Sequence, residues 1–349
     1  MLLDEIAQNI DNFKENIRLH LPYKPLFVKI KLVWDCNLKC QMCNHWRSNS
    51  TTLDIKVLEN LVTELSLLGC KRIHLTGGEP MMYPELPRLL SHIKKQGIRP
   101  TMTSNGTLIS NEKKAEKLAL SGLRKINISI DSPQANIHDE IRGIKGSFKR
   151  TTRGFRLLRA YMREGSMRVN MVVSPLNFKT VKDFPDLAND LGADYVRLIP
   201  LNAHTPELQR LTNEQINIYN NEIAPFAYEK ALKYGLVRTE KEIFVYGTAQ
   251  NEVNKSIDGF YSQDYYANHH CFALETHTLI DHLGNVSVCC MLPNAPKVGN
   301  ILEESFTKIW YGEKYTQLRQ SDKHIHHKCL ECTMFQKKNE QIEKMIYNS

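Results

Sequence analysis

The sequence predicts an α/β fold in which six parallel strands form a barrel or partial barrel, followed by a smaller C-terminal part. From residue 26 to residue 201, short β-branched runs alternate with longer amphipathic runs. This alternation is typical of parallel strands joined by right-handed helical crossovers. Polar and glycine-rich segments follow four of these strands, and the alternation stops after Leu201.

The predicted strands are short runs rich in β-branched residues. They cover residues 26–34, 72–76, 99–104, 125–130, 168–173 and 195–201. Helical periodicity fills the gaps, at residues 53–68, 84–96, 112–121, 147–164 and 178–191. The alternating strands and helices are expected to form one unit over residues 26–210.

Four consecutive strands run into residues that are unusual in ordinary turns. These are Cys36, then Gly77-Gly78-Glu79-Pro80, then Ser104-Asn105-Gly106, then Asp131-Ser132-Pro133. Parallel strands end at one edge of the sheet, where active residues gather in such folds. We therefore expect these four segments to converge.

Residues 1–25 are expected to form a helix that packs on the barrel. Leu3, Ile6, Ile10, Phe13 and Ile17 recur with spacings of three and four residues, which places them on one helical face.

The C-terminal part has a different pattern. Residues 211–270 are predicted as a connection that begins with a helix at 212–235 and continues as an irregular segment. Residues 271–349 are predicted as a further domain, with a β-hairpin at 276–290 that turns at Gly284-Asn285 and a helix at 303–319. Because no repeat or low-complexity linker separates the parts, we expect them to pack together.

Composition excludes several classes of protein. The 349 residues include 46 Lys and Arg against 38 Asp and Glu, a net charge of +8, and 24% are charged. The mean hydropathy is −0.41 and no apolar run approaches the roughly 20 residues of a membrane span. The first residues carry acidic side chains and no small-residue cleavage site, unlike a signal peptide. We expect a cytoplasmic protein.

The nine cysteines are grouped, which favours metal ligation in a reducing compartment over a disulfide framework. Cys36, Cys40 and Cys43 form C-x3-C-x2-C with no fourth ligand nearby. Three thiolates without a fourth suit a 4Fe-4S cluster with one open iron better than a closed zinc site. A structural zinc knuckle is the alternative.

The segment CNLKCQMC at residues 36–43, together with GGEP at residues 77–80 after the next strand, resembles the radical S-adenosylmethionine (SAM) superfamily. The resemblance implies a partial (β/α)6 TIM-like barrel. It implies that Cys36, Cys40 and Cys43 hold a 4Fe-4S cluster whose open iron chelates the amino and carboxylate groups of SAM.

The same resemblance assigns further contacts to SAM. The methionine amino group would meet Gly77, Gly78, Glu79 and Pro80. Ser104 and Asn105 would meet the ribose or carboxylate, with Ser129 and Asp131 in the same neighbourhood, and Arg142 would pair with the carboxylate. The adenine would pack on Met42 and on residues 196–200, including Val196 and Leu198. Ser104, Ser129 and Asp131 fit turn or capping roles equally well.

Four cysteines near the C-terminus form a second group. Cys271, Gly284 and Cys289 are followed by Cys329 and Cys332 in a C-x2-C pair. This spacing resembles the twitch domain, the one-cluster form of the SPASM extension found on some radical SAM enzymes. It implies that these four thiolates hold an auxiliary 4Fe-4S cluster in a domain built from a β-hairpin and a helix. A zinc site that includes His324, His326 or His327 is the alternative.

The resemblance implies a reaction in which SAM is cleaved reductively to a 5′-deoxyadenosyl radical that abstracts a hydrogen atom from a substrate C–H bond. The auxiliary cluster would support oxidation or modification of a peptide, as in the maturation of ribosomally synthesised peptides (RiPPs), or of a small molecule such as a sugar. An epimerase is the alternative, with Cys290 as the catalytic hydrogen donor, although the position of Cys290 beside Cys289 favours a buried residue or an alternative ligand over a donor. A non-catalytic iron-sulfur or zinc scaffold for an acidic partner is the alternative of another class.

The resemblance also implies partners. An electron donor such as flavodoxin or ferredoxin would supply electrons. The 25 residues before the first strand are too few for a leader-binding domain, so a peptide substrate would need a separate leader-peptide-binding protein. Lys149, Arg153, Arg156 and Arg163 form an outward basic arc on the helix at 147–164, which suits a solvated face or an acidic partner. No aromatic residues interleave with this arc, so no nucleic acid is expected.

Overall fold

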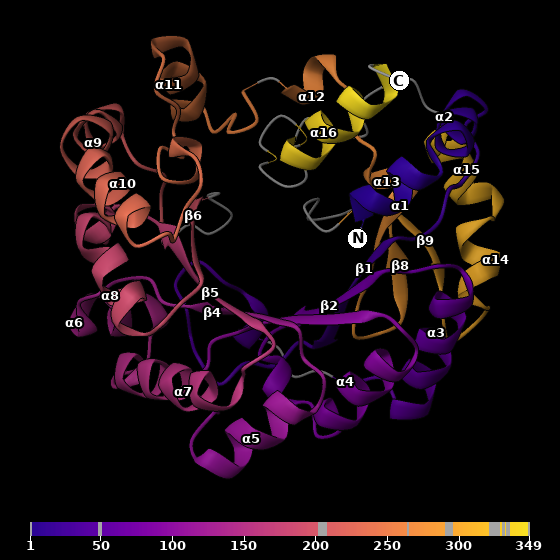
Figure 1. Cartoon of the computed structure of the whole chain (residues 1–349), viewed down its shortest axis with the longest axis horizontal. Helices are drawn as coiled ribbons and strands as arrows, with labels where there is room; N and C mark the ends of the chain where they lie inside the picture. Colours follow the sequence, from indigo (N-terminus) through magenta and orange to yellow (C-terminus); the bar gives the residue numbers. More distant parts are fainter. Residues whose placement is uncertain are drawn as a thin grey trace.

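The computed structural model describes residues 2–47, 51–201, 208–263, 265–289, 296–320, 329, 332 and 336–347. The described strands form one curved sheet of nine strands in the order β6-β5-β4-β3-β2-β1-β7-β8-β9. Helices cover the convex side of this sheet, and α12 and α16 lie across its open side (Figure 1).

The first six strands confirm the predicted barrel pattern. Each pairs in parallel with the next along the chain, as expected for strands joined by helical crossovers. Their bounds are β1 Phe27–Val33, β2 Arg72–Gly77, β3 Arg99–Ser104, β4 Lys125–Ser129, β5 Ser166–Val173 and β6 Tyr195–Pro200.

The crossover helices lie close to their predicted positions. They are α3 Ile55–Leu67, α4 Leu86–Lys95, α5 Glu112–Leu120, α7 Ser147–Tyr161 and α8 Phe184–Asp190, the last preceded by the 3-10 helix η3 Phe178–Asp183. Two more short 3-10 helices, η1 His45–Arg47 and η2 Pro80–Met82, follow β1 and β2. The helix α6 Ala135–Arg142 was not predicted, because its eight residues offer too short an apolar stripe.

Alternation along the strands separates an apolar outer face from a polar inner face. On β2, Ile73 and Leu75 are completely buried against the helices, whereas Arg72 and His74 lie on the inner face and are half-buried. The same separation holds on the neighbouring strands, because paired residues share a face. The main hydrophobic core therefore lies between the sheet and the outer helices.

The C-terminal strands extend the barrel sheet rather than forming a separate layer. The strand β7 His277–Ile280 pairs in parallel with β1, and β8 Asn285–Ser287 and β9 Lys297–Asn300 follow in antiparallel order. The hairpin turn contains Gly284 at φ +85°, a left-handed conformation that suits glycine. Two helices follow, α14 Phe306–Trp310 and α15 Glu313–Arg319, where one was predicted.

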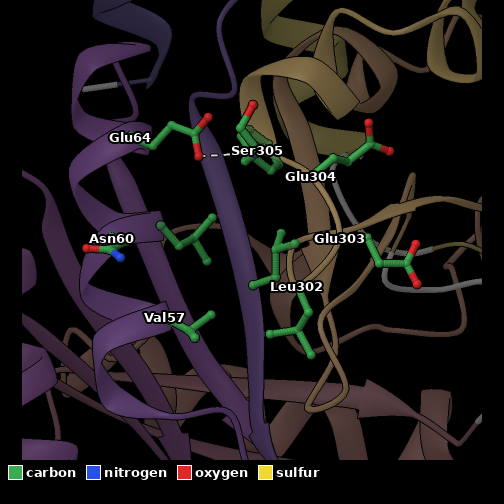
Figure 2. A pocket seen from close by; sticks show the side chains of 10 residues that line it. Val57, Asn60, Glu64, Leu302, Glu303, Glu304 and Ser305 are labelled. Carbon is green, nitrogen blue, oxygen red and sulfur yellow. Dashed lines mark hydrogen bonds between the residues drawn. The ribbon is translucent and has the colours of Figure 1, made fainter.

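The seam between the barrel and this extension lies at α3. A surface hollow of about 330 Å³ there is lined by α3 and by the segment that leads into α14 (Figure 2). At this seam the Glu64 carboxylate accepts hydrogen bonds from the backbone N–H groups of Phe306 and Thr307, at 3.1 and 2.7 Å. The hollow contains no cysteine among its lining residues.

The apolar face of the N-terminal residues packs on a helix of the same chain that the sequence did not predict as its neighbour. Two helices, α1 Leu2–Gln8 and α2 Ile10–Arg18, replace the single expected helix, and they contact the C-terminal helix α16 Gln336–Tyr347. Ile6 and Phe13 are buried with Phe272 and Ile342 in a second cluster. The expectation that this stripe packs on the barrel was wrong, because α16 supplies the apolar face that covers it.

The connection is more helical than predicted. The helix expected at 212–235 consists of α9 Asn213–Ile218, a π-helical turn Tyr219–Ile223 and α10 Ala224–Lys233. The segment expected to be irregular contains η5 Glu240–Glu242, α11 Gln250–Ile257 and α12 Tyr265–Asn268, and α13 Ala273–Thr276 leads into β7. None of the described helices is both long enough and apolar enough to cross a membrane.

Candidate functional site

The loop after β1 carries Cys36, Cys40 and Cys43, and the end of α6 fixes its backbone. The N–H of Lys39 donates to the carbonyl of Arg142 at 3.1 Å, and the N–H of Gln41 donates to that of Ile141 at 3.0 Å. The N–H of Cys43 donates to the carbonyl of Cys40, which turns the loop back on itself. The cysteine loop, residues 34–44, is thus held against the carboxyl edge of the barrel.

The thiols of this loop are withdrawn from water. Cys40 is 7% exposed, and Cys36 and Cys43 are half-buried. Burial raises the pKa of Cys36 to about 11, against a hydrogen bond from the Leu38 backbone that lowers it. Burial also raises the pKa of Cys40. These two thiols therefore stay protonated at neutral pH unless a bound metal stabilises their thiolates.

The glycines after β2 let that strand end directly beneath the cysteine loop. Gly78 donates its N–H to the Val33 carbonyl at 2.8 Å, and Glu79 donates its N–H to the Asp35 carbonyl at 2.9 Å. A Cβ atom on Gly78 would overlap the Asp35 carbonyl oxygen. Only glycine permits this close approach of two backbones.

The Glu79 carboxylate joins the ends of β2 and β3. Its Oε1 accepts hydrogen bonds from the Ser104 hydroxyl at 2.8 Å and the Met81 N–H at 3.0 Å, and its Oε2 accepts from the Asn105 N–H at 2.7 Å. Burial raises the pKa of Glu79, which is 1% exposed, and these three hydrogen bonds oppose the rise. Its contact with an ammonium group stays a prediction.

Asn105 connects the end of β3 to the cysteine loop. Its Nδ2 donates to Oδ1 of Asn37 at 2.9 Å and lies 3.9 Å from Sγ of Cys36. Asn37 in turn donates to the Thr107 hydroxyl at 2.8 Å. The ends of β1, β2 and β3 therefore meet, as the sequence predicts.

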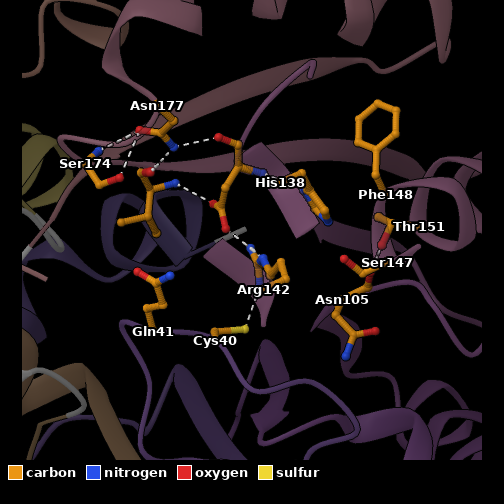
Figure 3. A network of polar contacts seen from close by, with 12 residues as sticks. Cys40, Gln41, Asn105, His138, Arg142, Ser147, Phe148, Thr151, Ser174 and Asn177 are labelled. Atoms are coloured by element: carbon orange, nitrogen blue, oxygen red, sulfur yellow. Dashed lines mark hydrogen bonds and ion pairs between the residues drawn. The ribbon is translucent and has the colours of Figure 1, made fainter. Parts of the chain in front are cut away.

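Arg142 and Asp131 form a buried ion pair beside Cys40. Nε of Arg142 lies 2.7 Å from Oδ2 of Asp131, and Nη1 of Arg142 lies 3.7 Å from Sγ of Cys40. Figure 3 shows Arg142 directed toward Cys40, with the polar side chains of Ser174 and Asn177 in the same network. Burial alone would lower the pKa of Arg142, but Asp131 and Cys40 raise it above its usual value.

Asp131 is completely buried, and both its side chain and its carbonyl accept hydrogen bonds. Its Oδ1 accepts from the Val172 N–H at 3.0 Å, and its carbonyl accepts from Nδ2 of Asn177 at 2.6 Å. Asp131 therefore acts through Arg142 in this arrangement. The contacts of Arg142 and Asp131 with SAM stay predictions.

The remaining residues predicted to contact SAM differ in their burial and in the face of the sheet on which they lie. Met42 is half-buried in the cysteine loop, and Ser129 is half-buried on the inner face at the end of β4. Pro80 is buried at the start of η2. Val196 and Leu198 are buried on the outer, helix-facing side of β6, because strand alternation puts Arg197 and Ile199 on the inner face. Their packing on adenine stays a prediction.

The C-terminal hairpin brings two cysteines to one end. Cys271 precedes α13 and β7, and Cys289 follows β8, the antiparallel partner of β7. The N–H of Cys332 donates to the Cys329 carbonyl at 3.1 Å. Burial raises the pKa of Cys271, and the nearby Cys332, Glu275 and Cys329 also raise it. Cys290 and the three histidines at 324–327 lie outside the described residues.

The donor sets fit soft metal ligation. Thiols are the ligands that iron-sulfur clusters require, and hydrogen-bond donors such as Arg142 and Asn105 lie beside their sulfurs. In the described part of the chain, no three His, Cys, Asp or Glu side chains already stand close enough together to hold a single metal ion.

Sequence reasoning missed an aromatic and imidazole group around Cys43. Nδ1 of His45 lies 3.0 Å from Sγ of Cys43, and the His45 ring lies 4.2 Å from the Trp34 ring. The ring of His282, from the C-terminal hairpin, lies 5.0 Å from the Trp34 ring. Burial lowers the pKa of His45 to about 4. No spacing signal connects His282 with Trp34, because the contact depends on the pairing of β7 with β1.

Comparisons with known proteins agree with this arrangement. Residues 34–188 match the model of the radical SAM superfamily, and residues 271–333 match that of the SPASM iron-sulfur cluster-binding domain. The first match spans the described strands β2 to β5 and the cysteine loop.

Individual relatives cover the chain to different extents. An AdoMet-dependent heme synthase of Methanosarcina barkeri is 25% identical over 88% of this chain and 88% of that one. A PqqA peptide cyclase of Gluconobacter oxydans is 30% identical over 53% of this chain and 51% of that one. Streptococcus suis SuiB bound to its precursor peptide SuiA has the same fold, with a TM-score of 0.67, 19% identity, and coverage of 93% and 73%.

Proposed function

Because residues 34–188 match the radical SAM superfamily and residues 271–333 match the SPASM iron-sulfur cluster-binding domain, we propose that the chain is a SAM-cleaving enzyme that modifies an organic substrate. One observation carries the proposal. The cysteine loop, the Gly-Gly turn and the Ser104-Asn105 turn meet at one edge of the sheet through the Glu79 and Asn105 hydrogen bonds.

Cys36, Cys40 and Cys43 are the proposed ligands of a SAM-binding 4Fe-4S cluster, and Cys271, Cys289, Cys329 and Cys332 those of an auxiliary cluster. When bound, the first cluster and SAM together supply a 5′-deoxyadenosyl radical able to abstract a hydrogen atom from a C–H bond. Arg142 and Asn105 donate toward the sulfurs of Cys40 and Cys36. These donors stabilise negative charge on the ligand sulfurs.

The chain's residues also position SAM. The Gly77-Gly78 turn leaves backbone at the edge of the sheet, and Glu79 holds that turn to the end of β3. Arg142 brings one cationic group to the cysteine loop, already paired with Asp131. We propose that the SAM carboxylate binds on the remaining side of this guanidinium and that the methionine amino group binds at the Gly-Gly turn.

The proposed reaction is oxidation or another modification of a peptide or a small molecule. The PqqA peptide cyclase supports a peptide, and the heme synthase, which matches over most of both chains, supports a small molecule. A reduced flavodoxin or ferredoxin is the proposed electron donor. The basic side chains of Lys149, Arg153 and Arg156 are exposed on α7 and offer an acidic donor a docking face.

The test compares wild type with a Cys36/Cys40/Cys43→Ala variant after anaerobic reconstitution. We expect about eight irons per wild-type chain and about four per variant chain, as two clusters and one cluster require. With dithionite and SAM, wild type should form 5′-deoxyadenosine and the variant should form none. Equal iron contents, or wild-type protein with a full iron content that leaves SAM intact, would overturn the proposal.

A further inference from the structure

The inner face of the barrel is unusually basic. The six barrel strands contain no Asp or Glu and seven basic residues: Lys29, Lys31, Arg72, Arg99, Lys125, Arg168 and Arg197. Every one of these falls on the inner side of the strand alternation, opposite the buried apolar residues of the core. They are half-buried rather than sealed.

Five of these cations and one from α16 form a single group, the inner cationic cluster: Arg72, Arg99, Lys125, Arg168, Arg197 and Lys338. Burial, together with the charges of Arg168, Arg72, Arg99 and Arg197, lowers the pKa of Lys125 to about 8. Burial, together with the charges of Arg72, Arg197 and Lys125, lowers the pKa of Lys338 to about 7.

Like charges so arranged repel one another. Burial, together with the charges of Arg197 and Arg72, lowers the pKa of Arg168 to about 9, and the carboxylate of Glu242 opposes this shift. The Glu242 carboxylate already accepts hydrogen bonds from the backbone N–H groups of Arg238 and Thr239. Packing alone does not require charge at these positions, so the cluster needs another explanation.

Polar atoms with no hydrogen-bond partner in the described structure lie beside the cluster. They include the buried Nε donor of Arg168 and the Oδ1 acceptors of Asn127 and Asn170. Asn127 is paired with Arg168 in the β4–β5 register, and Asn170 is paired with Arg197 in the β5–β6 register. Asn127 and Asn170 are 5% and 8% exposed. Buried polar atoms in this condition are costly and point to a bound group that satisfies them.

We propose that the inner cationic cluster binds the anionic end of the substrate, a small molecule that carries at least two phosphate or carboxylate groups. The inference rests on the proposed function for the role of its ligand as substrate. Guanidinium groups bind phosphate and carboxylate through paired hydrogen bonds, and several converging cations select multiple negative charges.

The inner cationic cluster lies at the opposite end of the strands from the cysteine loop. Arg72 begins β2, and the Gly77-Gly78 turn lies five residues later, about 16 Å along an extended strand. The anionic end is therefore held away from the cysteine loop, and the rest of the molecule extends toward the carboxyl edge of the sheet. Nζ of Lys338 lies 5.4 Å from the centre of the Phe27 ring on β1. The helix α16 therefore lies next to the proposed site.

The experiment measures anion binding by calorimetry on the anaerobic holoenzyme, with pyrophosphate and citrate as probes at low and high salt. Wild type should bind at least one probe at a single site, and binding should weaken with salt. Arg168→Gln and Lys125→Gln should each weaken binding by about tenfold or more, because each removes a charge-assisted hydrogen bond. Arg168→Lys, which keeps the charge, should bind more tightly than Arg168→Gln.

Arg88→Gln is the matched control, because Arg88 is an exposed arginine on α4, on the outer side of the sheet. It should bind the probes as wild type does. Iron content and melting temperature verify that each variant is folded, and if Arg168→Gln does not fold, Lys125→Gln provides the comparison. Stronger binding of pyrophosphate indicates a phosphorylated substrate, and stronger binding of citrate a polycarboxylate.

Failure of wild type to bind either probe would overturn the inference, as would equal binding by the inner variants and Arg88→Gln. The proposed function has a separate readout, because SAM cleavage with dithionite does not depend on the anion. Loss of 5′-deoxyadenosine formation with intact anion binding would contradict the proposed function only. Normal cleavage without anion binding would contradict this inference only.

Discussion

Single buried side chains hold the candidate site together, and each ionic one is compensated. Arg142 is balanced by Asp131 at 2.7 Å, and Glu79 accepts three hydrogen bonds. An unpaired buried charge at either position would lower the stability of the fold by several kcal/mol, as in other proteins where one partner of a buried ion pair is removed. His138 is the neutral member of this group, since it is completely buried and its Nδ1 accepts a hydrogen bond from the Asp131 N–H at 3.1 Å.

The protonation of His138 makes stability depend on pH. Burial, together with the charge of Arg142, lowers the pKa of His138 from its usual value of 6.5 to about 3. Between these values the unfolded chain binds a proton that the folded chain does not, so the free energy of unfolding falls as the pH drops below about 6.5.

From pH 7.5 to pH 5.5 we expect this single group to remove roughly 1 kcal/mol of stability. The measurement compares melting temperatures at the two pH values for wild type and His138→Asn, which cannot take up the proton. The variant should lose less of its melting temperature than wild type between the two conditions. Identical losses would show that His138 is not the group that titrates.

At the scale of elements, α6 supports the cysteine loop from below. The last residues of α6 accept the loop's backbone hydrogen bonds, and Gly143 ends the helix with φ +67°. A Cβ atom on Gly143 would overlap the carbonyl oxygen of Lys39, the residue beside Cys40. The helix end and the loop therefore fit together only with glycine at this position.

We expect Gly143→Ala to disturb the loop and lower the iron content of the reconstituted protein by about one cluster. Gly97→Ala is the matched control, because Gly97 has a similar φ of +74° but nothing within 4 Å of its Cβ position. Both variants bear the left-handed strain of about 1 kcal/mol, so any difference between them reports the contact with Lys39. Iron analysis would contradict the expectation if the two variants retained equal amounts.

For the whole molecule, the continuous sheet makes the barrel and the C-terminal extension one structural unit. The strand β7 pairs with β1 over four residue pairs, and α14 docks on α3. Trp310 of α14 is completely buried and donates its indole N–H to the Tyr23 carbonyl at 2.8 Å, ahead of β1. Contacts of this kind couple the stability of the two parts.

Trp310→Ala should therefore destabilise the barrel as well as the extension, by about 3–5 kcal/mol as for other large-to-small core changes. Thermal unfolding followed by circular dichroism should show one transition at a lower temperature. Phe226→Ala, at a side chain 58% exposed, should leave the melting temperature close to that of wild type. A variant in which only part of the signal melts early would show that the two parts unfold independently.

The order of the elements and the residues that converge at the site could be predicted from local patterns in the sequence. Six of the strands were predictable because β-branched runs and glycine turns are local signals, and paired strand ends must meet at one edge of a parallel sheet. The cysteine spacing and GGEP were equally local, so Cys36, Gly78 and Asn105 were predictable as neighbours.

Tertiary structure decided what local pattern does not encode. The pairing of β7 with β1 brought His282 next to Trp34, and α16 rather than the barrel covered the stripe of Ile6 and Phe13. The inner cationic cluster arose in the same way, since Arg72, Arg168 and Lys338 lie far apart in the chain. Such contacts depend on which faces meet across the fold, and that choice is made by packing between distant segments rather than by propensity within any one of them.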